Sequence, residues 1–110
     1  MTFDDYQKQA LTTVISTDDS FKDTLHWVLG LCGEAGEVAE KVKKIIRDKN
    51  GAISDEDKTE LAKELGDVLW YLAVFAHEMG FSFEEVAASN LKKLQDRQAR
   101  GVLGGSGDNR

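Results

Sequence analysis

The segment from Phe21 to Lys49 carries apolar residues on two sides of what its spacing predicts to be one long helix. The first apolar stripe consists of Leu25, Val28, Leu29, Cys32, Ala39, Val42 and Ile46. The second stripe consists of Trp27, Leu31, Val38 and Ile45. A helix that is apolar on two sides is buried on two sides. In a chain of 110 residues, we predict that one of its two neighbours is another subunit.

Three further helical segments are predicted along the chain. They run from Phe3 to Ser16 with Thr2 as N-cap, from after Ser54 to near Met79, and from Ser82 to near Arg100. The long helix should end at Asn50-Gly51, which is a typical C-terminal signal. Proline is absent, and no stretch alternates as a strand does. We therefore predict an all-α fold, a four-helix bundle completed by oligomerisation.

Length and charge narrow the classes of protein that this chain can belong to. We expect one helical domain over residues 1–100 and a glycine-rich tail over residues 101–110. A net charge of −6 excludes duplex nucleic acid as a partner, but not a phosphorylated small molecule that binds through metal ions.

No membrane-spanning run and no signal peptide are visible, so we predict a cytoplasmic protein that does not act at a membrane. The single cysteine, Cys32, is predicted to be a buried free thiol in a reducing compartment.

Two pairs of carboxylates stand out on the two longest helical segments. Glu34 and Glu37 form the first pair, and Glu64 and Asp67 form the second. Residues three apart lie on one side of a helix, with Cβ atoms about 5–6 Å apart, so each pair can converge on a small cation. Hard oxygen ligands without His or Cys select Mg²⁺, Mn²⁺ or Ca²⁺ over zinc. Mg²⁺, with Mn²⁺ as a possible substitute, fits a phosphorylated substrate best, because it commonly bridges to phosphates. The alternative is a solvated helix face, on which these charges pair with Lys41, Lys44 or Lys63.

The context of these pairs resembles a known family. Gly30-Leu-Cys-Gly-Glu-Ala-Gly-Glu-Val-Ala-Glu40, followed by Glu64-Leu-Gly-Asp-Val-Leu-Trp-Tyr71, looks like the MazG-type all-α nucleotide pyrophosphohydrolases, whose signature is E-x-x-E, a spacer and E-x-x-D. The resemblance implies that Glu34, Glu37, Glu64 and Asp67 hold the metal. It also implies cleavage between the α and β phosphates. Either Glu34 or Glu37 would orient or deprotonate the attacking water.

A second match lies in the last helical segment. Asn90, Lys93 and Arg97 fit the family's N-x-x-K-L-x-x-R pattern, whose basic residues meet the substrate phosphates. Their spacing places an amide, a point charge and a guanidinium on one helix face, although a basic surface stripe would look the same. By the same resemblance, Tyr71 would stack on the base, and core packing is the alternative. The tail resembles those of short family members, and with Arg110 it could fold over bound phosphates or be disordered.

These observations predict a Mg²⁺-dependent enzyme that converts a nucleoside or deoxynucleoside triphosphate to the monophosphate and pyrophosphate. A narrower pyrophosphohydrolase, such as one acting on phosphoribosyl-ATP, shares the helical fold and the acidic pairs. A non-catalytic helical interaction module would keep the apolar stripes but would not need the four carboxylates together. By the resemblance, the protein is expected to form a homo-oligomer, either a dimer or a tetramer made of two dimers.

Overall fold

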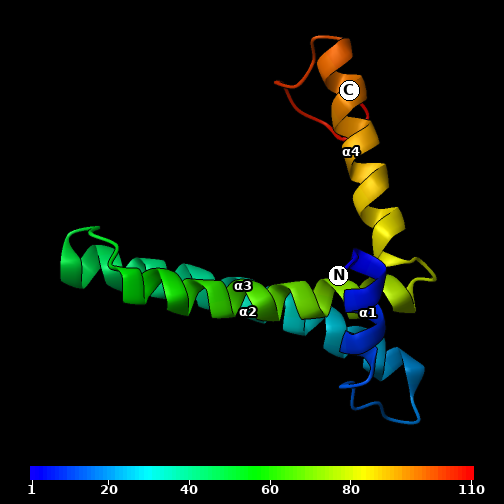
Figure 1. Ribbon diagram of the computed structural model, residues 1–110, viewed down its shortest axis with the longest axis horizontal. Coiled ribbons are helices and arrows are strands. Elements are labelled where there is room, and N and C mark those ends of the chain that lie inside the picture. The colour runs from blue at the N-terminus through cyan, green and yellow to red at the C-terminus, as the bar shows by residue number, and fades with distance from the viewer.

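The fold consists entirely of α-helices (Figure 1). The computed structural model describes residues 1–110 and contains four α-helices and no strand. The helices are α1 (Phe3–Leu11), α2 (Ser20–Lys49), α3 (Asp55–Glu78) and α4 (Phe83–Ala99). The prediction of an all-α fold is confirmed. None of the four helices combines the length and apolar character needed to cross a bilayer.

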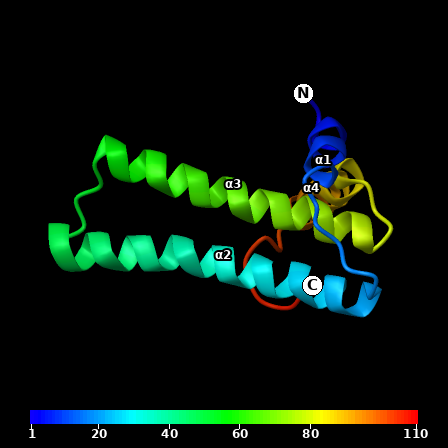
Figure 2. The ribbon, with the colours of Figure 1, turned by 90° about the horizontal axis from the view of Figure 1, so that it is seen from below.

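Helices α2 and α3 form a long antiparallel hairpin (Figure 2). Helix α2 runs without a break through its three internal glycines, and one of these permits a close approach between the two helices. A Cβ atom added to Gly30 would lie 2.2 Å from Cε1 of Tyr71, so the Tyr71 ring occupies the space that any larger residue would need. The hairpin turns at Asn50 and Gly51, both of which have positive φ, as the Asn-Gly pair predicts.

The helix starts follow from capping residues that the sequence displays. Ser54 and Asp57 form a reciprocal capping box at α3, and Ser82 and Glu85 form one at α4. Thr2 caps α1, as expected. These side chains bind backbone N–H groups that would otherwise lack a partner in the first turn of each helix.

Helix α1 is shorter than predicted, because it ends at Leu11 and not at Ser16. The hydroxyl groups of Thr12 and Thr13 donate to the carbonyl oxygens of Gln9 and Ala10, which satisfies the last carbonyls of the helix. The run Thr12-Thr13-Val14-Ile15 is entirely β-branched, and such residues lose side-chain freedom in a helix. The chain therefore leaves the helix here and continues in an extended connection to α2.

Helix α1 ties α3 to α4 through one buried glutamine. The Gln7 amide nitrogen donates to the carbonyls of Ala73 at 2.9 Å and Phe81 at 3.2 Å, and its oxygen accepts from the Phe83 N–H at 3.0 Å. Asp4 accepts a further hydrogen bond from the Glu84 N–H at 2.9 Å. The position of α4 relative to the hairpin is thus set by α1.

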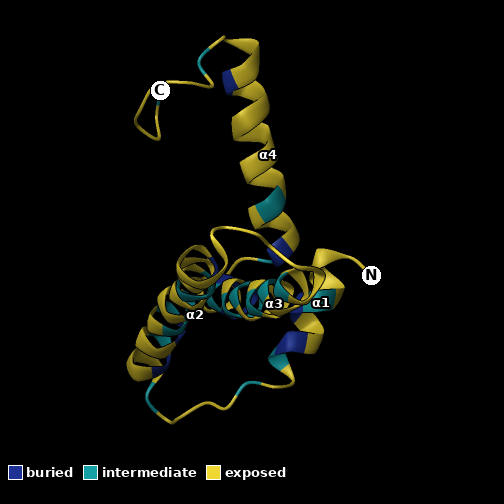
Figure 3. Ribbon diagram, turned by 90° about the vertical axis from the view of Figure 1, so that its left-hand side faces the viewer, coloured by how far each residue is buried: buried dark blue, intermediate teal, exposed yellow.

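Most of the small buried core lies where α1 meets the α2–α3 hairpin and the start of α4 (Figure 3), while one member, Ile45, lies near the turn between α2 and α3. Its apolar members are Ala10, Trp27, Ile45, Ala73, Val74, Ala76 and Phe83. The second stripe of α2 is buried or half-buried against α3, whereas most of the first stripe is exposed, including Leu29 and Ile46. Cys32 belongs to this first stripe and is exposed, so the prediction that it is buried is wrong for the single chain. Nothing in the chain folds back over this side of α2.

Helix α4 projects away from the hairpin and does not complete a closed bundle within one chain (Figure 1). It contacts α1 and α3 at its beginning but does not contact α2. Most of its length is exposed, including Val86, Leu91 and Leu94. The tail that follows, residues 101–110, folds back along the end of α4.

Candidate metal centre

Three of the four carboxylates singled out in the sequence meet in the middle of the hairpin. Glu34 from α2 and Glu64 and Asp67 from α3 each offer one oxygen atom, and these oxygens all lie within 4.8 Å of one another. The antiparallel course of the helices brings them together, because it sets the first acidic pair against the second. A donor set made only of carboxylate oxygens suits a hard divalent cation. The residues present therefore fit such an ion.

Glu37 is the fourth carboxylate, and it lies outside this group. It follows Glu34 by one helical turn and is exposed to solvent. The structure thus gathers Glu34, Glu64 and Asp67 and leaves Glu37 at the edge of the cluster.

Lys41, one of the three lysines that the alternative interpretation pairs with these carboxylates, contacts the cluster. Lys41 Nζ lies 3.1 Å from a carboxylate oxygen of Glu64 and 3.5 Å from one of Glu60. The other two lysines of that alternative do not reach it: Lys44 lies 3.9 Å from Glu40, and Lys63 lies 2.8 Å from Glu60. Pairing with lysines therefore accounts for one member of the cluster, Glu64, and leaves Glu34 and Asp67 without a cationic partner.

The electrostatics of the cluster are unfavourable for an unliganded protein. Burial raises the pKa of Glu34, and the negative charge of Asp67 raises it further, followed by smaller contributions from Glu64 and Glu37. Carboxylates that disfavour each other's ionisation are stabilised when a divalent cation lies between them. The cluster therefore has the features of a cation site. Without a cation, the repulsion between its carboxylates lowers the stability of the folded chain.

Aromatic side chains adjoin the cluster on the side toward the open end of the hairpin, away from the turn at Asn50 and Gly51. Tyr71 lies one turn after Asp67 and packs against Gly30, and its ring meets Trp70 edge-to-face at 4.9 Å. The exposed His26 stacks on the buried Trp27 at 4.7 Å. Tyr71 is half-buried, so part of its ring packs within the hairpin while the rest remains accessible beside the carboxylates.

The three predicted phosphate-binding residues lie on α4, away from the carboxylates. Asn90 and Lys93 line a shallow hollow of about 400 Å³ together with Phe81 and Val86. Arg97 is buried at the other end of the helix, beneath the tail. Because α4 does not contact α2, one chain does not bring this group together with Glu34.

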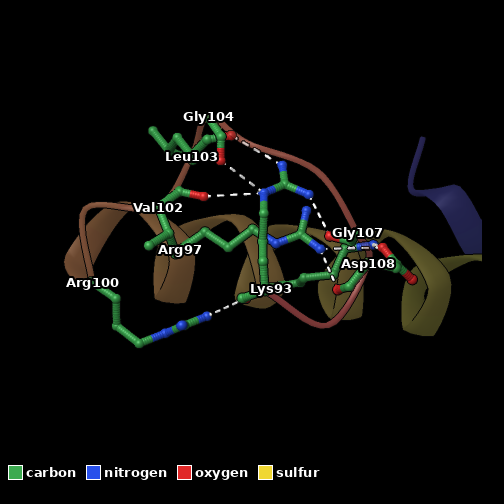
Figure 4. A network of polar contacts seen from close by, with 9 residues as sticks. Lys93, Arg97, Arg100, Val102, Leu103, Gly104, Gly107 and Asp108 are labelled. Carbon is green, nitrogen blue, oxygen red and sulfur yellow. Dashed lines mark hydrogen bonds and ion pairs between the residues drawn. The ribbon is translucent and has the colours of Figure 1, made fainter.

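The sequence named Lys41 as a possible partner of the acidic pairs, and the antiparallel register places it beside Glu64. One residue of these sites, Asp108, was missed by reading the sequence. Asp108 lies between Lys93 and Arg97 (Figure 4), and no sequence pattern connects the tail to these residues.

The hairpin and its carboxylates together define an all-α protein with a candidate divalent-cation centre built from two facing helices. A family model described as the MazG nucleotide pyrophosphohydrolase domain matches residues 22–102, which include α3, α4 and all but the first two residues of α2. The chain belongs to this family. The resemblance seen in the sequence is confirmed.

Two relatives support this assignment. The chain is 47% identical over 114 aligned residues to Gene 37 protein of Mycobacterium phage L5, and the match covers both chains completely. It is 38% identical over 72 residues to the protein YvdC of Bacillus subtilis (strain 168), a match that covers 61% of this chain and 68% of YvdC. No solved structure matches the chain.

Proposed function

We propose that this protein is a Mg²⁺-dependent nucleoside triphosphate pyrophosphohydrolase, which cleaves an NTP or dNTP between the α and β phosphates. The observation that carries the proposal is the convergence of Glu34, Glu64 and Asp67 from two facing helices. Membership of the MazG family supplies the reaction class. The substrate range and the metal are our extension of these two findings.

Each candidate residue has a role in this proposal. Glu34, Glu37, Glu64 and Asp67 would hold Mg²⁺, or Mn²⁺ in its place, and the ion would neutralise phosphate charge when bound. Glu34 or Glu37 orients or deprotonates the attacking water. The exposed part of the Tyr71 ring, one turn from Asp67, is available to stack on the base.

Asn90, Lys93 and Arg97 would bind the phosphates, and we propose that a second copy of the chain brings them to the carboxylates. Within one chain α4 does not contact α2, and the first apolar stripe of α2 is exposed. A second copy that covers this stripe would bury it and complete the site. We propose a homo-oligomer, a dimer or a dimer of dimers, that contains one domain per chain over residues 1–100.

Replacing an apolar residue of this stripe by a charged residue tests the assembly. Ile46→Glu places a charge on the exposed face of α2, 62% of Ile46 being accessible in the single chain. We expect light scattering to show a smaller species than wild type, together with loss of hydrolysis. Lys43→Glu, a charge change on the same helix at an exposed polar position, is the control. An Ile46→Glu protein of unchanged mass would remove this face from the interface.

The reaction itself is tested by product analysis. The protein is incubated with Mg²⁺ and a panel of canonical and modified NTPs and dNTPs, and the products are separated by ion exchange. We expect a monophosphate and pyrophosphate from one or a few nucleotides, and no turnover in EDTA, because the phosphate charge is then not neutralised. Turnover that survives EDTA would contradict the metal-dependent mechanism.

The same panel separates the alternatives. Phosphoribosyl-ATP is included, so that turnover of this compound alone would identify the narrower activity. Absence of turnover with every compound, in protein that is folded and oligomeric, would favour a non-catalytic helical module.

A further inference from the structure

The C-terminal tail, residues 101–110, is folded around its own last residue. The Arg110 guanidinium donates to four tail carbonyls, those of Val102, Leu103, Gly104 and Gly107. Arg100 at the end of α4 donates to the Arg110 carbonyl at 2.7 Å. These hydrogen bonds hold the tail as a compact loop against α4. They also engage Arg110 within the loop, so its guanidinium is not presented to a bound phosphate in this conformation.

The same loop delivers a carboxylate to two of the residues proposed to bind phosphate (Figure 4). Asp108 Oδ1 accepts hydrogen bonds from Lys93 Nζ at 3.0 Å and from Arg97 Nη2 at 3.2 Å. Arg97 Nη2 also donates to the backbone oxygen of Asp108. Both cations hold the pKa of the Asp108 carboxyl below its usual value, Lys93 contributing most. Asp108 is therefore ionised and paired at neutral pH.

Arg97 is not accessible to a ligand while the loop is in place. Its side chain is only 7% exposed, whereas the Asp108 side chain is 80% exposed. An incoming polyphosphate would meet the carboxylate before it met the guanidinium. Carboxylates and phosphates use the same donors of arginine and lysine, so Asp108 and a phosphate compete for one site.

We propose that residues 101–110 form a clasp in which Asp108 acts as an internal anion on Lys93 and Arg97, and that a polyphosphate must displace Asp108 to bind them. This inference rests on the proposed function, because it assigns both cations to the phosphates. The bonds that open are the two ion pairs of the exposed Asp108 carboxylate, with Lys93 and with Arg97, and hydrogen bonds local to the tail. Gly101, Gly105 and Gly107 have positive φ, and glycine adopts other conformations freely when the loop rearranges.

Binding of inorganic tripolyphosphate tests the clasp directly. Calorimetry in EDTA measures the affinity without hydrolysis and with no divalent cation present. Asp108→Asn should bind tripolyphosphate about two- to fivefold more tightly than wild type, the range expected when the exposed Asp108 carboxylate no longer competes. Asp18→Asn removes the same charge from an exposed loop position with no ion pair, and its affinity should equal that of wild type. Unchanged or weaker binding by Asp108→Asn would overturn the clasp.

A second variant acts on the same clasp through a different residue. Arg110→Ala removes the hydrogen bonds to the four tail carbonyls and should also tighten tripolyphosphate binding, because the loop no longer holds Asp108 in place. If this variant binds more weakly, the tail assists phosphate binding and the proposal fails. Nucleotide hydrolysis assayed in parallel distinguishes the two proposals. If the variants bind tripolyphosphate more tightly but the protein hydrolyses no nucleotide, the clasp is retained and the proposed enzymatic function is rejected. If the protein hydrolyses nucleotide but the variants bind tripolyphosphate as wild type does, the enzymatic function is retained and the clasp is rejected.

Discussion

The tip and the middle of the α2–α3 hairpin use carboxylates in opposite ways. At the tip, Asp57 accepts hydrogen bonds from the Ser54 N–H at 3.0 Å and from Lys49 Nζ at 2.9 Å. These contacts, with the Ser54 backbone bond contributing most, lower the pKa of Asp57 to about 2. In the middle, burial and the charge of Asp67 raise the pKa of Glu34.

The difference separates a charge that stabilises the fold from a charge that opposes it. Asp57 is more stable as an ion in the folded chain than in the unfolded chain, so its charge favours folding. Glu34 is less stable as an ion in the folded chain, so its charge opposes folding. Groups whose pKa is shifted unfavourably in this way cluster at functional sites. The carboxylate at the tip thus stabilises the hairpin, and the candidate metal centre lies in its middle.

The largest effect should be the loss of nucleotide hydrolysis when a carboxylate in the middle of the hairpin is removed. Asp67→Ala should reduce nucleotide hydrolysis by about a hundredfold or more, because loss of a metal ligand or of its support commonly lowers activity on that scale. Its melting temperature without divalent cations should not fall, since a repulsive charge is removed. Glu60→Gln, one turn before Glu64 but outside the cluster, is the control and should retain activity. Full activity of Asp67→Ala would remove the metal-site assignment.

A smaller effect should come from the contact that fixes the distance between the helices beside the cluster. Gly30→Ala places a methyl group 2.2 Å from the Tyr71 ring, so the helices must shift. We expect a loss of about 1–3 kcal/mol in the free energy of unfolding, typical of overpacking. Gly33→Ala has no neighbouring atom within 4 Å in the chain and should instead gain up to about 1 kcal/mol from helix propensity. Equal behaviour of both variants in urea unfolding would contradict this packing.

The smallest effect should be a pH-dependent loss of folding stability when Asp57 at the tip is replaced. The folded pKa of Asp57, about 2, lies below its ordinary value of 3.8. Its contribution to stability is therefore complete above about pH 4 and is lost as the pH falls toward 2. Asp57→Asn should be less stable than wild type at pH 7 and should lose less stability on acidification over this range. Asp55→Asn, in the same first turn but highly exposed, is the control, and both are compared by urea unfolding.

Local signals in the sequence predicted most of the helices. The caps at Ser54 and Ser82 and the turn at Asn50 are chemical requirements of helix ends, so they can be read from a few neighbouring residues. The convergence of Glu34, Glu64 and Asp67 followed from spacing and family resemblance, although their binding of a metal stays a prediction. The prediction that α1 extends to Ser16 was wrong, because the β-branched run from Thr12 to Ile15 leaves the helix.

Features that depend on tertiary contacts could not be predicted. Cys32 was expected to be buried because its stripe is apolar, but no element of the chain covers that stripe. Asp108 reaches Lys93 and Arg97 only because the tail reverses its direction, and the glycines that permit this do not reveal where the loop will dock. No sequence pattern singled out Gln7, which is buried.

The hydrogen bonds of Gln7 also bear on the order in which the chain assembles. They join residues 66, 74 and 76 positions apart, whereas the hairpin joins neighbouring helices through a short turn. Closing a long loop costs more chain entropy than closing a short one, so distant pairings form slowly. We expect refolding to protect the amides of α2 and α3 from hydrogen exchange before the Phe83 amide, which donates to Gln7. The docking of α1 is then the last step, and a nascent chain would hold its hairpin before it fixes α4.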